Sequence, residues 1–266
     1  MEFMDVIRKR KTTNGYVKED PVSREHQMLL MEAAGRAPSH MNSQPWRFIM
    51  IDDKEKIRKI AKIAGRTMRK SMEGSFFKEN RKYFRFSRKE IMDKRDGMYF
   101  SQLPAFLGPM VRFLFERDVI KRLKSLGVTK ILGADNEDLV AKSPLLIAVL
   151  YKEDEYGAHE ERLDFYYNFA ASVAIGMSIE NLWLTCTDLG IGIQFVSSPK
   201  HYPEAWQEIR NILKIPEEMK LMALLRLGYE LEKSKSGAIS WESDIRKRPD
   251  QYVHRNEYGN MEKSEE

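Results

Sequence analysis

The chain has 266 residues, of which 42% are hydrophobic and 32% charged, and its formal net charge is +5; this balance supports a buried core and excludes a disordered chain. The one cysteine, Cys186, excludes an intrachain disulfide framework, an iron–sulfur cluster held by several thiolates and a Cys-rich zinc site, and it indicates a reducing, cytoplasmic compartment. The N-terminus lacks the pattern of a secretory signal and no apolar run approaches the ~20 residues of a membrane-spanning helix, which predicts a soluble protein with no membrane partner.

The first elements predicted are a helix, a polar loop, a strand and a second helix. The helix covers about residues 24–36, because Ser23 is a good N-cap and Gly35 and Pro38 end the apolar pattern. A loop follows at residues 38–45. The apolar, β-prone residues 46–51 then predict a buried strand, and apolar residues repeat at helical spacing over residues 57–64.

The net charge is concentrated in one stretch. Residues 54–95 hold sixteen Lys and Arg against five Asp and Glu, a local excess of +11. One interpretation is a solvated helical face. The other is a surface that attracts nucleic acid, an anionic membrane or a phosphate-bearing cofactor.

Regular patterns resume after an irregular stretch at residues 66–140, which we interpret as an excursion from the core. Residues 145–151 are continuously apolar and predict a central strand buried on both faces. The Ala-rich residues 164–189 predict a long helix. A turn and strand at residues 190–196, a helix at 203–213 and a strand at 221–229 complete an α+β fold with a mixed sheet, and the polar tail after Trp241 is expected to wrap over a neighbour or fray.

Several common catalytic motifs are absent from the sequence. It contains no Gly-x-Gly-x-x-Gly, Walker, His-Glu-x-x-His or Gly-x-Ser-x-Gly motif, and its five histidines are scattered. No metal site is therefore predicted. What remains is the loop at residues 38–45, where the amides of Asn42 and Gln44 can donate and accept at once, as the pyrimidine end of a flavin requires.

The segment from Ala37 to Trp46, Ala-Pro-Ser-His-Met-Asn-Ser-Gln-Pro-Trp, resembles the Ala-Pro-Ser-x-x-Asn-x-Gln-Pro-Trp segment of the FMN-dependent nitroreductase family. Four further elements match that family in order. They are residues 10–14 with Tyr16, the Leu-Gly-Ile-Gly turn at 189–192, the Ile-Pro-Glu and Gly-Tyr pairs at 215–217 and 228–229, and the basic motif at 246–249 followed by residues 253–254. Together they span most of the chain outside residues 66–140.

The resemblance implies a single domain over residues 1–266, with a mainly antiparallel mixed sheet flanked by helices and a helical lid at about 66–140. It also implies a homodimer with FMN at the subunit interface and a C-terminal arm that wraps the partner. The implied reaction is ping-pong: NADPH or NADH reduces the flavin at N5, and an electron-poor small molecule such as a nitroaromatic or a quinone is then reduced.

The resemblance also assigns site residues. Those for the FMN phosphate and ribityl chain are Arg10, Lys11, Thr12, Asn14, Arg246 and Arg248. Those beside the ring are Pro38, Ser39, His40, Asn42 and Gln44 from the loop, and Gly190, Gly192 and Ile193 from the turn. Asn14 departs from the family, which has an arginine there. His40 is the candidate proton donor.

Other interpretations stay open at this point. Taken singly, the cations at residues 8–11 fit an ordinary solvated cluster, Gly190 and Gly192 an ordinary turn, and His40 a capping or packing residue. A second enzyme hypothesis keeps the scaffold but makes it a reductive dehalogenase. A third, of another class, is a non-enzymatic binder of nucleic acid or a membrane surface through residues 54–95; the family resemblance implies no nucleic-acid partner.

Overall fold

The computed structural model describes residues 2–74, 79–99, 127–152, 161–232 and 245–261. The chain divides into two compact units, which are described separately. Unit 1 comprises Met1–Ser71 and Lys130–Gly237, and unit 2 comprises Met72–Thr129 and Ala238–Glu266. Unit 2 thus contains most of residues 66–140, the predicted excursion from the core, together with the C-terminal tail.

Unit 1 is built on a four-stranded sheet. Its strands lie in the order β1 (Trp46–Ile51), β4 (Leu145–Lys152), β6 (Met219–Tyr229) and β5 (Ile191–Phe195), and every neighbouring pair is antiparallel. The predicted α+β fold with a mainly antiparallel sheet flanked by helices is therefore confirmed, and the described strands of this sheet form antiparallel pairs throughout rather than a mixed sheet. The register between β4 and β6 shifts at Val149 and Leu150, an irregularity that the sequence pattern did not indicate.

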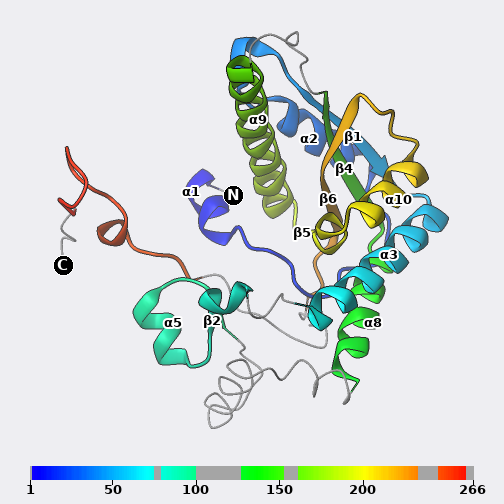
Figure 1. Cartoon of the computed structure of the whole chain (residues 1–266), viewed down its shortest axis with the longest axis horizontal. Helices are drawn as coiled ribbons and strands as arrows, with labels where there is room; N and C mark the ends of the chain where they lie inside the picture. Colours follow the sequence, from blue (N-terminus) through cyan, green and yellow to red (C-terminus); the bar gives the residue numbers. More distant parts are fainter. Residues whose placement is uncertain (1, 75–78, 100–126, 153–160, 233–244, 262–266) are drawn as a thin grey trace. The chain divides into compact units, whose positions relative to one another are not determined.

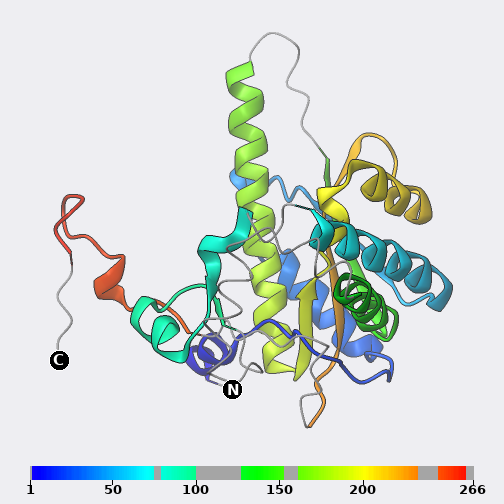
Figure 2. The ribbon, with the colours of Figure 1, turned by 60° about the horizontal axis from the view of Figure 1, so that its bottom comes forward.

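Helices cover both faces of this sheet (Figures 1 and 2). On one face α2 (Arg24–Gly35) and α9 (Glu161–Asp188) pack against Leu145, Ile147 and Val149 of β4. On the other face α3 (Lys54–Glu73), α8 (Val128–Ala141) and α10 (Pro203–Leu213) pack against the alternate residues of that strand. Because helices lie on both faces, β4 is buried for six residues, as its continuous apolar run predicts.

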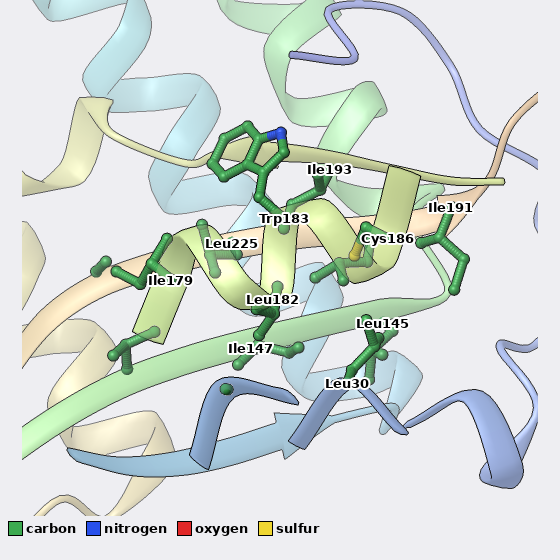
Figure 3. Close-up of a cluster of buried hydrophobic side chains, with 14 of the residues drawn as sticks. Leu30, Leu145, Ile147, Ile179, Leu182, Trp183, Cys186, Ile191, Ile193 and Leu225 are labelled. Carbon is green, nitrogen blue, oxygen red and sulfur yellow. The ribbon is translucent and has the colours of Figure 1, made fainter. Parts of the chain in front are cut away.

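The α9 helix forms the centre of the first of these faces, shown in Figure 3. Leu182, Trp183 and Cys186 lie in its buried cluster. Two hydrogen bonds join α9 to α2: the Ser178 hydroxyl donates to the Ala34 carbonyl at 2.8 Å, and the Asn181 amide donates to the Ala33 carbonyl at 3.1 Å. Ser23 caps α2 by accepting from the His26 N–H, as predicted.

One stretch of α9 also passes a composition test for a membrane span. By length and mean hydropathy, 1.3, Asn168–Asp188 qualifies among the described helices. Inside the structure 44% of its most apolar window is buried, and core helices of soluble proteins pass the same test. The result is therefore weak evidence for a membrane.

Unit 2 contains short elements within its described residues. They are the 3₁₀ turn η2 (Arg81–Tyr83), β2 (Phe84–Arg85), α5 (Arg88–Lys94), β3 (Met98–Tyr99) and the 3₁₀ turn η5 (Pro249–Gln251). Strands β2 and β3 pair in parallel. Arg85 is buried and forms an ion pair with Asp96. Residues 100–126, in the middle of the helical lid expected at about 66–140, lie outside the described residues.

Candidate functional site

The N-terminal segment, residues 10–18, follows the short helix α1 (Phe3–Lys9) and runs along the edge of the sheet. The Thr13 N–H donates to the Ile193 carbonyl at 3.0 Å, and the Lys18 N–H donates to the Tyr229 carbonyl at 2.8 Å. From α9, the Trp183 indole N–H donates to the Lys11 carbonyl at 2.8 Å. The backbone that carries the predicted phosphate residues is therefore held by both the sheet and α9.

Two glycines allow this close approach. A Cβ on Gly192 would lie 2.8 Å from side-chain atoms of Thr13, and one on Gly228 would lie 2.6 Å from a methyl group of Val17. In this chain, therefore, Gly192 has the N-terminal segment as its neighbour. Gly190 adopts a left-handed φ of +66° and has open space at its Cβ position.

A pocket of about 230 Å³ lies where the N-terminal segment meets the Gly190 turn. It brings together Lys11 and Gly190 of the predicted site with Thr13 and Glu230. Glu230 accepts from the Thr13 hydroxyl at 3.2 Å and pairs with the Lys11 ammonium, also at 3.2 Å. Glu230 is not among the site residues predicted from the sequence, where its one signal is its place directly after the strand that ends at Gly228 and Tyr229.

Neighbouring residues of the segment point in different directions. The Arg10 side chain is 22% exposed, lies 3.8 Å from the Glu180 carboxylate and stands 5.8 Å from the centre of the Trp183 ring. Asn14 accepts a hydrogen bond from the Gln194 amide at 3.0 Å. Thr12 is half-buried. Arg10 thus faces α9, Lys11 faces Glu230, and Asn14 faces Gln194 of β5.

The second part of the predicted site, the loop at residues 38–45, contains a 3₁₀ turn, η1 (His40–Asn42). Met41, Asn42 and Gln44 have φ values of 51°, 55° and 46°. Left-handed backbone costs a non-glycine residue about 1–3 kcal/mol and persists only where the surroundings enforce it. Such strain is common in ligand-binding loops.

The surroundings hold this loop at both ends. Ala37 and Trp46 are buried against Ala174 of α9. Inside the loop, the Ser39 hydroxyl accepts from the Gln44 N–H at 3.0 Å and the Gln44 amide donates to the Asn42 side-chain oxygen at 3.3 Å. Asn42 and Gln44 are exposed and His40 is half-buried. The loop therefore presents polar side chains from a fixed, strained backbone.

The loop and the Gly190 turn do not meet within one chain. In the register of the sheet, Trp46 pairs with Tyr151 of β4, which in turn pairs with Lys220 of β6. Ile191 pairs with Tyr229, at the other end of β6. These two β6 positions are nine residues apart, or about 30 Å along the strand. One copy of the chain therefore does not bring both predicted ring-binding segments onto one small cofactor.

The C-terminal cations belong to unit 2. The Arg248 side chain pairs with Asp250 at 3.3 Å, and the Arg246 carbonyl accepts from the Arg95 side chain at 2.9 Å. Lys247 lies 3.6 Å from Asp96. That Arg246 and Arg248 join the N-terminal segment at one anion stays a prediction.

The basic stretch is partly neutralised where it lies in unit 1. On α3, Lys59 pairs with Glu55, while Arg66 and Lys70 pair with Glu208 and Glu204 of α10, each at 2.7–2.9 Å. All these side chains are substantially exposed. This part of the stretch has the character of a solvated helical face. Within the described ranges, no group of three or more His, Cys, Asp or Glu side chains could hold a metal ion.

The chain is similar to known proteins over most of its length. The Nitroreductase family profile matches residues 7–229. YdgI of Bacillus subtilis, named as an NAD(P)H nitroreductase, is 36% identical over 63 residues, which cover 24% of this chain but only 30% of YdgI. The iodotyrosine deiodinase of Thermotoga neapolitana is 22% identical over 228 residues, covering 85% of this chain and 87% of the deiodinase.

Solved structures share the fold at lower identity. NfrA2 of B. megaterium superposes with a TM-score of 0.58 at 16% identity, covering 97% of this chain and 75% of that one. An iodotyrosine deiodinase bound to FMN and 3-iodo-L-tyrosine superposes with a TM-score of 0.52 at 17% identity, covering 88% of this chain and 92% of that one. Because the family profile spans most of the sequence, the chain belongs to the nitroreductase family.

Proposed function

We propose that this nitroreductase-family protein is an FMN-dependent oxidoreductase that takes reducing equivalents from NADPH or NADH and passes them to an electron-poor small molecule. The observation that carries the proposal is the loop at residues 38–45. Three left-handed residues are held there by buried ends, and polar side chains face outward. A backbone fixed in this way suits the binding of a planar ring with alternating donors and acceptors.

The donors of the N-terminal segment fit the other end of FMN. Its phosphate is a dianion, and Arg10, Lys11 and Thr12 supply two cations and a hydroxyl on a backbone that β5 and α9 hold in place. Glu180 and Glu230 already engage the two cations at 3.8 Å and 3.2 Å. The Lys11 side chain is 58% exposed and the Arg10 contact is long, so both pairs are weak and a phosphate can displace them at small cost.

Bound FMN would supply the hydride chemistry, accepting a hydride at N5 and returning electrons to the acceptor. The protein's own contribution is to bind and orient. Residues of the N-terminal segment would bind the FMN phosphate, and the loop at residues 38–45 would contact the flavin ring. No side-chain nucleophile or metal is required for this role.

We further propose that the working form is a homodimer. Phe169, Val173 and Met177 lie four residues apart on α9 and are 58%, 44% and 36% exposed. Side chains at this spacing form a single stripe along a helix. Exposed apolar stripes mark interfaces, and a two-fold pair would let the loop of one copy face the N-terminal segment of the other. This arrangement accounts for the 30 Å separation along β6 in one chain.

His40 is the proposed proton donor to the reduced acceptor. It is half-buried at the start of the strained turn in the loop. We expect His40→Ala to lower the rate of acceptor reduction about 100-fold while leaving the rate of flavin reduction by NAD(P)H unchanged, since His40 would give its proton only in acceptor reduction. Stopped-flow measurement of the two half-reactions separates them. Equal rates for both steps in the variant and the wild type would remove His40 from the mechanism.

A second candidate is reductive dehalogenation. The observation that favours it is the similarity to the Thermotoga neapolitana deiodinase over 87% of that protein. Reconstituted protein can be offered NAD(P)H with either a nitroaromatic compound or 3-iodotyrosine, and nitro reduction and iodide release measured side by side. Faster nitro reduction supports the oxidoreductase, whereas iodide release alone supports the dehalogenase.

We propose a cytoplasmic location for either enzyme, in keeping with the buried, free thiol of Cys186.

A further inference from the structure

The basic motif at residues 246–249 is held by the turn that follows α5, in the same compact unit. The Arg95 side chain donates from Nε to the Arg246 carbonyl at 2.9 Å, and the Asp96 carboxylate lies 3.6 Å from the Lys247 ammonium. The C-terminal segment lies beside α5 in both views of the ribbon (Figures 1 and 2). Two consecutive residues of the turn thus hold two consecutive residues of the motif, 151 positions further along the chain.

The turn at residues 95–97 depends on two residues with left-handed backbone. Arg95, the C-cap of α5, has a φ of 53°, and Gly97 has a φ of 84°. A Cβ on Gly97 would clash with the Tyr83 carbonyl oxygen and lie 3.2 Å from Nε of Arg85. Glycine therefore lets the turn come close to β2, which brings the carboxylate of the turn to Arg85.

This buried arginine fixes the carboxylate in place. Arg85 is 5% exposed, and one of its terminal nitrogens donates to the Lys82 and Phe84 carbonyls at 2.8 Å and 3.0 Å. The other terminal nitrogen pairs with Asp96. The hydrogen bond from Arg85 holds the pKa of the Asp96 carboxyl below its ordinary value, so Asp96 is an anion at neutral pH. Because Asp96 is already fixed, its pair with Lys247 costs less side-chain entropy than a pair between two free surface residues.

The cations of the basic motif divide between different partners. The Lys247 side chain pairs with the turn, whereas Arg246 is held by it through a backbone carbonyl. Arg248 has an extended backbone, with φ −81° and ψ 156°, and its side chain pairs with Asp250 at 3.3 Å. The family resemblance assigns Arg246 and Arg248 to the FMN phosphate and gives Lys247 no role. The contact with Asp96 supplies one.

We propose that the two contacts of the turn, Arg95 with Arg246 and Asp96 with Lys247, form a clasp that couples the basic motif to residues 81–99, which lie within the expected lid. A phosphate-bearing cofactor held by the motif thereby also stabilises residues 81–99. The coupling is reciprocal, so order in residues 81–99 in turn favours binding of the cofactor. This effect of the cofactor rests on FMN binding, as proposed above, whereas the clasp itself needs no FMN.

The double variant Arg95→Met with Lys247→Met tests the clasp. It removes both side chains that join the turn to the basic motif and leaves the buried ion pair of the turn intact. The matched control is Lys89→Met with Lys94→Met, which removes the same charge from exposed positions of α5. There Lys94 pairs with Glu90 of the same helix, at 3.4 Å.

Hydrogen–deuterium exchange of the amides of residues 81–99, followed by mass spectrometry, gives the readout. In apo-protein, we expect these amides to exchange at least threefold faster in the clasp variant than in the wild type and the control. Saturating FMN should slow the exchange at least fivefold in the wild type and the control but less than twofold in the clasp variant. Riboflavin, which has no phosphate, should slow it less than twofold in all three proteins.

Each outcome decides a different claim. Wild-type protein that binds no FMN overturns the proposed function and the effect of the cofactor, while exchange in the apo-proteins still decides whether the clasp exists. Binding of FMN without slower exchange at residues 81–99, or equal slowing by riboflavin, overturns the coupling alone. Equal exchange in the clasp variant and the control overturns the clasp. If the clasp variant does not fold, Lys247→Met alone must exchange faster than Lys94→Met, and equal exchange in these two variants overturns the clasp.

Discussion

At the scale of single residues, the contacts of the candidate site join positions that are far apart in the chain. Asn14 and Gln194, which share a hydrogen bond, are 180 positions apart. Composition and resemblance therefore indicate the polar loop at residues 38–45 and the cations at residues 10–11 but not their partners. Nor does the sequence show that Met41, Asn42 and Gln44 adopt left-handed backbone, since none of them is a glycine.

Cys186 provides a prediction at this scale. It lies on the side of α9 that packs against the sheet and is fully buried, and burial raises the pKa of its thiol because the thiolate would lose its hydration. We expect a thiol reagent at pH 8 to modify native protein at least ~100-fold more slowly than protein unfolded in guanidinium. Comparable rates in the two states would show that the α9 face opens readily.

At the scale of elements, the helices and strands that could be predicted are those with a strong local pattern of apolar or capping residues. The run at residues 145–151 and the Ser23-capped helix were identified because burial and capping leave local signals. The crossing of α3 and α8 has no such local signal in the sequence. A Cβ on Gly65 would lie 2.8 Å from the Gly133 carbonyl oxygen, and one on Gly133 would lie 2.9 Å from the Gly65 carbonyl oxygen. The two helices therefore touch backbone to backbone.

We expect Gly65→Ala and Gly133→Ala each to lower the free energy of unfolding by about 1–3 kcal/mol, because the added methyl group forces the two backbones apart. Gly35→Ala is the matched control, since it lies in α2 with open space at its Cβ position and should not destabilise the protein. Urea unfolding gives all three values. If the three variants had equal stability, the close crossing of α3 and α8 would be ruled out.

At the scale of the whole molecule, the sequence indicated the family and the fold, while the geometry adds a constraint on assembly. The two predicted ring-binding segments lie at opposite ends of β6, and α9 exposes an apolar stripe. A second copy would explain both features. No sequence pattern shows this, because exposure of Phe169, Val173 and Met177 depends on which side of α9 faces the sheet.

A charge in the stripe should therefore prevent assembly. We expect Val173→Glu to convert a dimer to a monomer in light scattering and to weaken FMN binding at least tenfold, since a carboxylate buried in an apolar interface stays unpaired. Ile131→Glu makes a comparable change at a 58% exposed position of α8 and should leave both properties unchanged. A wild-type monomer that binds FMN fully would contradict the dimer.

The most direct test of the account is the titration of wild-type apo-protein with FMN beside Arg10→Ala. We predict saturable quenching at one FMN per chain, a yellow complex that NADPH or NADH bleaches, and at least tenfold weaker binding for the variant, which lacks the cation that Arg10 holds over Trp183. A wild-type protein that neither quenches FMN fluorescence nor retains the flavin on gel filtration would contradict it.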